Sequence, residues 1–202
     1  MAVAGRRSRG AIRDRRSIAA EPEPLILFVG RLVPLKGPQV LIEAMGQVAQ
    51  VHPEAQLVLV GDGALRDQLR QHAQELGLAG QVRLLGYVRG KPLAALYRAA
   101  DVVVVPSLYE PFGLVALEAM VSGTPVVAAD AGGLAALVRD QQTGLKVPPN
   151  DPRALAGGIL RLLTDHDLAS GLAANARRMA MKQYSWTDVA KRTLALYQGL
   201  QG

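Results

Sequence analysis

The sequence predicts an α/β domain built on a doubly wound, Rossmann-like parallel sheet. Short apolar runs, which suit strands buried on both faces, alternate with longer segments of helical periodicity. Half of the 202 residues are hydrophobic, which is enough for a substantial core in one domain. Alternation of this kind is typical of parallel sheets covered by helices on both faces.

Five apolar runs supply the expected strands. Each is rich in valine, leucine or isoleucine and is followed by glycine, proline or aspartate. The expected strands cover residues 25–29, 56–60, 82–85, 101–105 and 125–129, with residues 144–147 as a sixth, edge strand. Because a helical segment separates each run from the next, we expect the strands to lie parallel.

Helical periodicity fills the segments between and after these runs. Pro38 suits the first turn of a helix, Gly77 suits a helix stop, and Asp167 suits an N-cap. The expected helices cover residues 38–51, 64–76, 92–100, 114–121, 134–138, 152–163, 167–181 and 187–200.

The N-terminal residues 1–23 differ in composition from the body of the chain, residues 24–202. Residues 1–24 hold six arginines and three acidic residues, a net charge of +3 out of the total of +6. Such a segment could be a transit peptide or a nucleic-acid-binding arm. A disordered linker or tail is favoured, since no aromatic residues are interleaved for base stacking. We therefore expect no nucleic-acid partner.

Composition also excludes several classes of protein. The chain has no cysteine, which rules out disulfides and thiolate chemistry. No apolar run approaches the length of a membrane span, and the N-terminus lacks the hydrophobic core of a signal peptide. These features predict a cytoplasmic protein with at most peripheral membrane contact.

Glycine and charged residues follow the expected strands at one edge of the sheet. They are Gly30-Arg31, Gly61, Gly86, Glu110 and Gly132-Gly133. Ligands of doubly wound sheets bind beyond the carboxyl ends of the strands, so this convergence predicts a nucleotide-type site.

The stretch from Pro106 to Met120 joins the fourth strand to the helix after it. Glu110 is expected in the loop, because Pro111 disfavours helical geometry for the residue before it. Glu118 is expected about one turn inside the helix that Gly113 admits. An acid and the free amides of a helix N-terminus would then face one crevice, where an anionic ligand can bind.

Two cations, Arg31 and Lys36, follow the first expected strand. They could neutralise a diphosphate, Arg31 through a bidentate fork and Lys36 as a point charge. The other interpretation is a solvated basic loop, and spacing alone leaves the two readings even.

The motifs resemble those of the retaining glycosyltransferases of family 4. Glu110 and Glu118 are separated by seven residues with Phe112-Gly113-Leu114 between them, as in that family. The likeness extends to three other segments, residues 30–37, 132–134 and 143–148, and covers roughly residues 24–200. It implies the GT-B fold, of which this chain would be the C-terminal, donor-binding half.

The resemblance implies hexosyl transfer from a nucleoside diphosphate sugar to an acceptor, with retention of configuration. Arg31 and Lys36 would grip the diphosphate, Glu110 would bind hydroxyls of the donor sugar, and Glu118 would bind the ribose. The implied catalytic residues are Arg31, Lys36 and Glu110. The implied donor-binding residues are Gly30, Arg31, Lys36, Val88, Glu110, Phe112, Gly113, Leu114 and Glu118.

The resemblance also sets expectations about partners. The acceptor site would lie in an N-terminal Rossmann domain, present in cis or in trans, so the chain alone is expected to transfer poorly. A non-catalytic nucleotide-sugar-binding or regulatory module is the alternative. No cofactor or metal is expected, and Asp165-His166-Asp167 is read as a helix boundary and not as a metal-binding triplet. One departure is Ala136, where the family often has glutamate.

Overall fold

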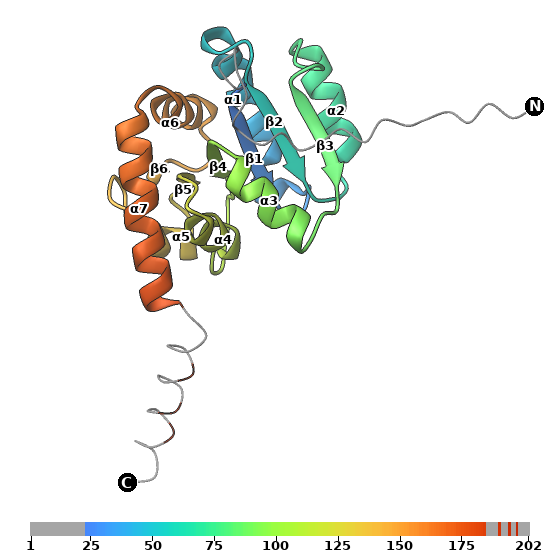
Figure 1. The fold of residues 1–202 in the computed structure, drawn as a ribbon. Coiled ribbons are helices and arrows are strands. Elements are labelled where there is room, and N and C mark those ends of the chain that lie inside the picture. Colours follow the sequence, from blue (N-terminus) through green and yellow to red (C-terminus); the bar gives the residue numbers. More distant parts are fainter. Residues whose placement is uncertain (1–22, 185–189, 191–193, 195–196, 198–202) are drawn as a thin grey trace, which may run out of the picture.

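The computed structural model describes residues 23–184 together with residues 190, 194 and 197 (Figure 1). Six parallel strands form one sheet in the order β3-β2-β1-β4-β5-β6. The strands are β1 (Leu25–Val29), β2 (Gln56–Val60), β3 (Val82–Gly86), β4 (Val102–Val105), β5 (Val126–Ala129) and β6 (Leu145–Val147). The predicted doubly wound α/β fold is confirmed.

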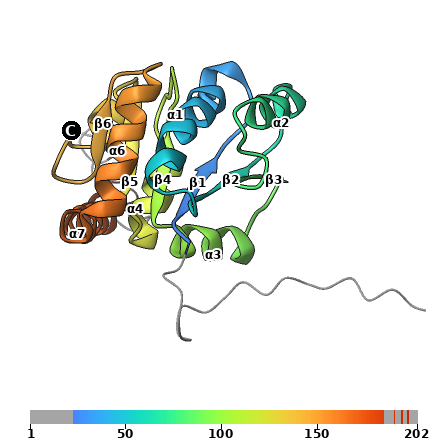
Figure 2. The same cartoon turned by 90° about the horizontal axis from the view of Figure 1, so that it is seen from above.

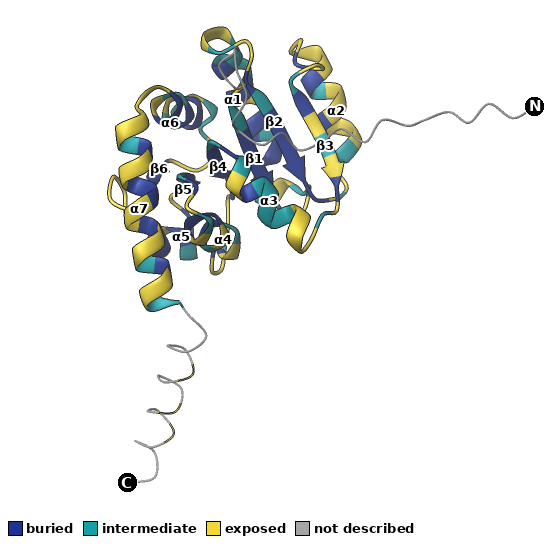
Figure 3. Cartoon of the chain, viewed as in Figure 1, coloured by how far each residue is buried: buried dark blue, intermediate teal, exposed yellow. Residues whose placement is uncertain are grey.

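Helices cover both faces of this sheet. They are α1 (Pro38–Val51), α2 (Arg66–Glu75), α3 (Lys91–Ala99), α4 (Leu114–Ser122), α5 (Gly133–Leu137), α6 (Pro152–Thr164) and α7 (His166–Gln183), with a short 3₁₀ helix η1 (Pro34–Lys36). Figure 2 shows α1, α2 and α6 on one face and α3, α4 and α7 on the other. Each face has its own apolar core, so the inner strands β2, β1, β4 and β5 are largely buried on both sides, whereas the edge strand β3 is partly exposed (Figure 3).

The strand order reverses between β1 and β4. β2 pairs with one side of β1, whereas β4, which comes later in the chain, pairs with the other, aligning Ile26 with Val102. The loops after β1 and β4 therefore leave the sheet beside each other and lead to opposite faces. Such a switch point is where open α/β sheets form their ligand crevice.

Four predicted helix starts differ from the structure: α3, α5 and α7 begin one residue earlier than expected, and α2 begins two residues later. α2 begins at Arg66 and not at residue 64, because residues 61–65 form a turn in which the Leu65 amide donates to the Leu32 carbonyl at 3.0 Å. The N-cap of α7 is Asp165, whose carboxylate accepts from the Leu168 amide at 2.9 Å. The prediction of Asp167 as the cap was wrong, since α6 ends one residue before Asp165 and leaves it free to cap.

Two further predictions concern segments that lie mostly outside the described residues. The tail, residues 1–23, lies outside the described residues except for its last position, and so does most of the helix expected over residues 187–200. Within the described residues, no helix has both the length and the apolar character needed to cross a membrane.

Candidate functional site

The loops after β1 and β4 are fastened to each other at the carboxyl edge of the sheet. The Leu108 amide donates to the Leu35 carbonyl at 2.9 Å. Gly37 has a φ of 67°, and a Cβ at this position would lie 2.2 Å from the Pro106 carbonyl oxygen. Only glycine lets the two backbones approach this closely, so the sequence at 37 fixes the loop spacing.

This contact brings Lys36 to Glu110. The Lys36 Nζ atom lies 2.5 Å from the Glu110 Oε2 atom, and the two side chains are 20% and 14% exposed. The other carboxylate oxygen of Glu110 accepts from the Gly113 amide at 3.3 Å. Three predicted site residues thus meet in one cluster at the start of α4.

The N-terminus of α4 carries no acidic residue in its first turn, and its N-cap is Gly113, at a φ of 93°. Glycine has no side chain that could cap the helix. The first-turn amides after Gly113 therefore receive no hydrogen bond from an N-cap side chain. These amides and the helix dipole give this end of α4 a partial positive charge.

The turn after β5 supports the loop that holds Glu110. The Gly133 amide donates to the Glu110 carbonyl at 2.6 Å. A Cβ on Gly132 would lie 2.4 Å from that carbonyl oxygen, and one on Gly133 would lie 2.4 Å from the Pro111 carbonyl oxygen. The Gly132-Gly133 pair is therefore needed for the shape of the site, because larger residues would push the loop away.

On the other side of β1, the loops after β2 and β3 join the same edge. A Cβ on Gly61 would lie 1.8 Å from the Gly30 carbonyl oxygen, and the Gly61 amide donates to the Gly86 carbonyl at 2.8 Å. Gly61 is therefore a glycine because the loop after β1 packs directly against its backbone.

Glu118 lies on α4 and does not join the Lys36–Glu110 cluster. Its Oε2 atom accepts a hydrogen bond from the Tyr97 hydroxyl of α3 at 2.7 Å. Burial, together with the hydrogen bond to Glu118 and the charge of its carboxylate, raises the pKa of Tyr97 above its usual range. Nothing in the sequence singles out Tyr97, because an aromatic residue at a helical position is typical of ordinary core.

The remaining predicted residues differ in burial and in their contacts. Arg31 is exposed, and among residues 23–184 no carboxylate lies within ion-pair distance of it. Val88 is half-buried against the apolar core of the α3–α4 face. Phe112 is 48% exposed and makes an edge-to-face contact with Tyr184, with ring centroids 6.1 Å apart. Leu114 is exposed.

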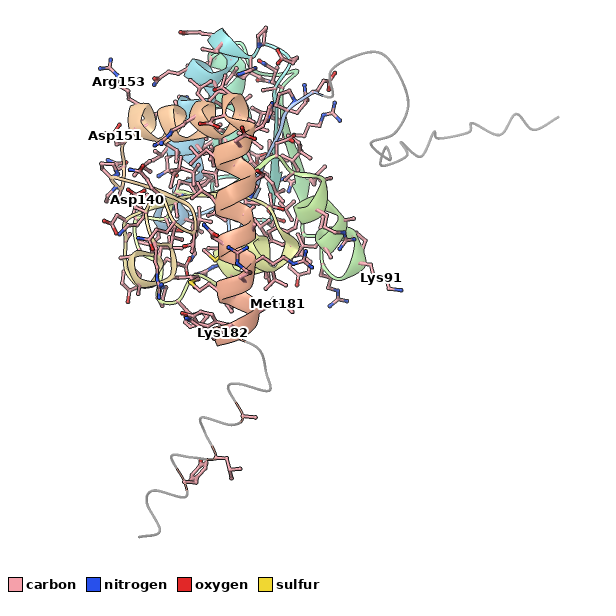
Figure 4. All side chains as sticks on the ribbon, turned by 60° about the vertical axis from the view of Figure 1, so that its left-hand side comes forward. Lys91, Asp140, Asp151, Arg153, Met181 and Lys182 are labelled. Carbon is pink, nitrogen blue, oxygen red and sulfur yellow. The ribbon has the colours of Figure 1, made fainter. Side chains whose placement is uncertain are left out.

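Two other features can now be placed. Ala136 is exposed on α5. Within the described part of the chain, no three histidine or acidic side chains gather as a metal site would require, and Asp165 serves as a helix cap. Figure 4 shows other charged side chains, such as Lys91 on α3 and Arg153 on α6, projecting outward at separate points of the surface.

Residues 11–179 match the model of a protein family described as glycosyl transferases group 1. The chain belongs to this family. A relative of this group 1 glycosyltransferase, a D-inositol 3-phosphate glycosyltransferase of Salinispora arenicola, is 45% identical over 205 positions, which cover 96% of the chain and 46% of the relative. The chain thus spans about half the length of the curated relatives it matches.

Solved structures show the same fold. The group 1 glycosyltransferase is similar to sucrose-phosphate synthase of Thermosynechococcus elongatus, with a TM-score of 0.82, 42% identity, and coverage of 89% of this chain and 46% of that one. It is similar to Anabaena HepE in complex with UDP-glucose, with a TM-score of 0.81, 31% identity, and coverage of 88% and 49%. It also matches the C-terminal domain of LpcC, a group 1 family protein of Francisella tularensis, with a TM-score of 0.74, 31% identity, and coverage of 81% and 87%.

These likenesses identify the described domain as the C-terminal, Rossmann-like domain of a GT-B glycosyltransferase. The predicted glycosyltransferase family is confirmed at the level of group 1, and so is the predicted GT-B fold.

Proposed function

We propose that this chain is the donor-binding half of a retaining, family 4 glycosyltransferase that transfers a hexosyl unit from a nucleoside diphosphate sugar. One observation carries the proposal: Lys36, Glu110 and the N-terminus of α4 converge at the switch point of the sheet. A cation, a carboxylate and free helix amides are the groups that a sugar diphosphate needs. The similarity to HepE, solved with UDP-glucose, supports a nucleotide sugar as the ligand.

The donor diphosphate would bind at the first turn of α4, beside Lys36 and Arg31. The Gly113 and Leu114 amides and the two cations would stabilise the charge that develops on the departing diphosphate. Glu110, which pairs with Lys36 in the free protein, would accept hydrogen bonds from sugar hydroxyls. The backbone near Val88, after β3, would contact the base. Gly30 and Phe112 would line the site.

We propose that the transfer requires no metal or other cofactor. Arg31, Lys36 and the helix N-terminus together supply positive charge of the kind that a divalent cation would otherwise provide. The acceptor remains unassigned.

A second domain would face this edge of the sheet. Large apolar side chains surround the cluster and are at least 36% exposed: Leu35, Leu108, Tyr109, Phe112 and Leu114. An exposed apolar patch on a soluble domain marks a surface that another partner covers. We propose that an N-terminal acceptor-binding Rossmann domain, in cis or in trans, covers this rim. We place the whole assembly in the cytoplasm and propose no nucleic-acid partner.

Calorimetric titration of the 202-residue chain with UDP, GDP and ADP and their hexose conjugates tests the proposal. Saturable binding of one nucleotide is expected, and Lys36→Ala and Arg31→Ala should each weaken it about tenfold or more. Arg161→Ala is the matched control, since Arg161 is exposed in the last turn of α6.

In an enzyme completed by its acceptor half, Arg31→Ala should lower turnover at least about a hundredfold. Binding without any transfer by the completed enzyme would favour the non-catalytic module instead. If folded chain binds none of these nucleotides, the proposed donor site is wrong.

A further inference from the structure

Tyr97 is a buried polar residue next to the site. Its side chain is 2% exposed and packs in the apolar core of the α3–α4 face, with Val105, Ala116 and Met120 among the members of that core. A buried hydroxyl needs a hydrogen-bond partner, because its loss of water is otherwise uncompensated. The Tyr97 hydroxyl finds its partner in the Glu118 carboxylate, 2.7 Å away.

The backbone of Tyr97 is fixed as well. The Thr124 hydroxyl, itself buried, donates to the Tyr97 carbonyl oxygen at 2.5 Å. Tyr97 is on α3, and Thr124 follows α4 after Gly123. One end of the tyrosine is therefore tied to the turn after α4 and the other to a side chain on α4, so its ring has a defined position between the two helices.

Glu118 would be far less ordered without this contact. It lies on the exposed side of α4, and within the described residues Tyr97 is the only donor to its carboxylate. A free glutamate side chain samples several rotamers and loses them when it binds a ligand. A carboxylate has two oxygens, so the bond to Oε2 leaves Oε1 free to accept a further hydrogen bond.

We propose that Tyr97 is a positioning residue that holds Glu118 ready to recognise the vicinal hydroxyls of the donor ribose. This inference rests on the proposed function and on the role that the family resemblance implies for Glu118, contact with the ribose of the donor. Tyr97 does not touch the donor. Its hydroxyl holds the Oε2 atom of Glu118 and leaves the Oε1 atom available to the ribose. The Glu118 side chain is therefore ordered before the ligand binds.

A purely structural role for Tyr97 predicts a different pattern. If its hydroxyl only stabilised the packing of α3 against α4, removing it would affect every ligand of the domain alike. If it acts through Glu118, the effect is confined to ligands that carry ribose hydroxyls and disappears when Glu118 is absent.

The experiment measures the affinity of the full chain for the diphosphate that it binds among UDP, GDP and ADP, and for the 2′,3′-dideoxy form of the same nucleotide. Four variants are compared with the wild type: Tyr97→Phe, Glu118→Ala, the double variant, and Tyr197→Phe as a control at an exposed tyrosine. The phenylalanine keeps the ring that fills the core, and thermal unfolding of each variant verifies the fold.

Tyr97→Phe should weaken binding of the ribose form about three- to tenfold, the range for one hydrogen bond. Binding of the dideoxy form should change less than about twofold, and Tyr97→Phe should add nothing in the Glu118→Ala background. Tyr197→Phe should behave as the wild type.

Four results would overturn the inference. Equal loss for the ribose and dideoxy forms, or additive losses in the double variant, would make Tyr97 structural and leave the donor site intact. A wild type that binds both forms equally would show that Glu118 does not read the ribose. A folded wild type that binds no nucleotide would remove the proposed function, and this inference with it.

Discussion

At the scale of single residues, backbone distances at the site depend on glycines that have no room for a Cβ. Gly37 and Gly77 both have a positive φ of nearly the same size, 67° and 73°. A Cβ on Gly37 would meet the Pro106 carbonyl, whereas one on Gly77 would meet nothing within 4 Å. The two positions therefore separate the cost of the conformation from the cost of the contact.

Gly37→Ala should destabilise the protein more than Gly77→Ala. Both changes put alanine in a left-handed conformation, at about 1–2 kcal/mol. Gly37→Ala should lose on the order of a further 1–3 kcal/mol because the two loops must move apart. Urea unfolding of the three proteins measures the difference, and equal losses would mean that the loops are not held at this contact.

Tyr97 should make stability depend on alkaline pH. Its pKa is raised in the folded protein by burial and by Glu118, whereas in the unfolded chain it is about 10. The contribution of the protonated hydroxyl is thus complete below about pH 10 and is lost as the pH rises further, at about 1.4 kcal/mol per unit. Free energies of unfolding from pH 9 to 11 should fall more steeply for the wild type than for Tyr97→Phe, and parallel slopes would contradict this.

At the scale of elements, most strands and helices could be predicted from the sequence, whereas the contacts between them could not. The apolar runs that end at Gly30, Gly61 and Gly86 predict β1, β2 and β3, since a short apolar run that stops at a glycine is a local signal of a strand. The Lys36–Glu110 pair joins residues 74 positions apart. It depends on how the loops pack, and no local pattern reports that.

The helix termini show where local pattern fails. Both Asp165 and Asp167 have the chemistry of an N-cap, and the choice depends on where α6 stops. Because α6 ends at Thr164, Asp165 is left with a non-helical backbone and caps α7, while Asp167 lies in the first turn of α7. The Tyr97–Glu118 bond escaped prediction for the same reason, since it depends on how α3 packs on α4.

Asp165→Ala should therefore cost about 1 kcal/mol of stability, through loss of the bond to the Leu168 amide. Asp167→Ala is the matched control and should cost less, because it loses only a favourable interaction with the helix dipole. Chemical denaturation of the two variants distinguishes them. A larger loss of stability for Asp167→Ala than for Asp165→Ala would contradict the assignment of Asp165 as the N-cap.

At the scale of the whole molecule, the apolar cores on the two faces of the sheet have different roles. The core under α1, α2 and α6 holds the sheet, while the core under α3, α4, α5 and α7 also supports Tyr97 and the start of α4. The loops after β1 and β4, which carry the proposed donor site, leave the sheet between these two cores. Every residue that the proposal places at the site lies between Gly30 and Glu118, so the proposal assigns no role in donor binding to residues 1–22.

Removal of residues 1–22 should accordingly leave nucleotide affinity and the unfolding midpoint unchanged. Those residues carry the six arginines of the tail. If instead the tail binds nucleic acid, the full chain should bind it with a steep salt dependence that truncation abolishes. Fluorescence anisotropy with a labelled oligonucleotide at several salt concentrations compares the two chains.

The central claim is that a nucleoside diphosphate binds at the carboxyl edge of the sheet, against the N-terminus of α4. Titration of the ¹⁵N-labelled chain with UDP, GDP and ADP, followed by NMR, tests it most directly. We expect saturable shifts of the Gly113 and Leu114 amides and of the loops after β1 and β3, with the last turn of α6 unchanged. Shifts confined to other surfaces, or no shifts in a folded sample, would contradict the claim.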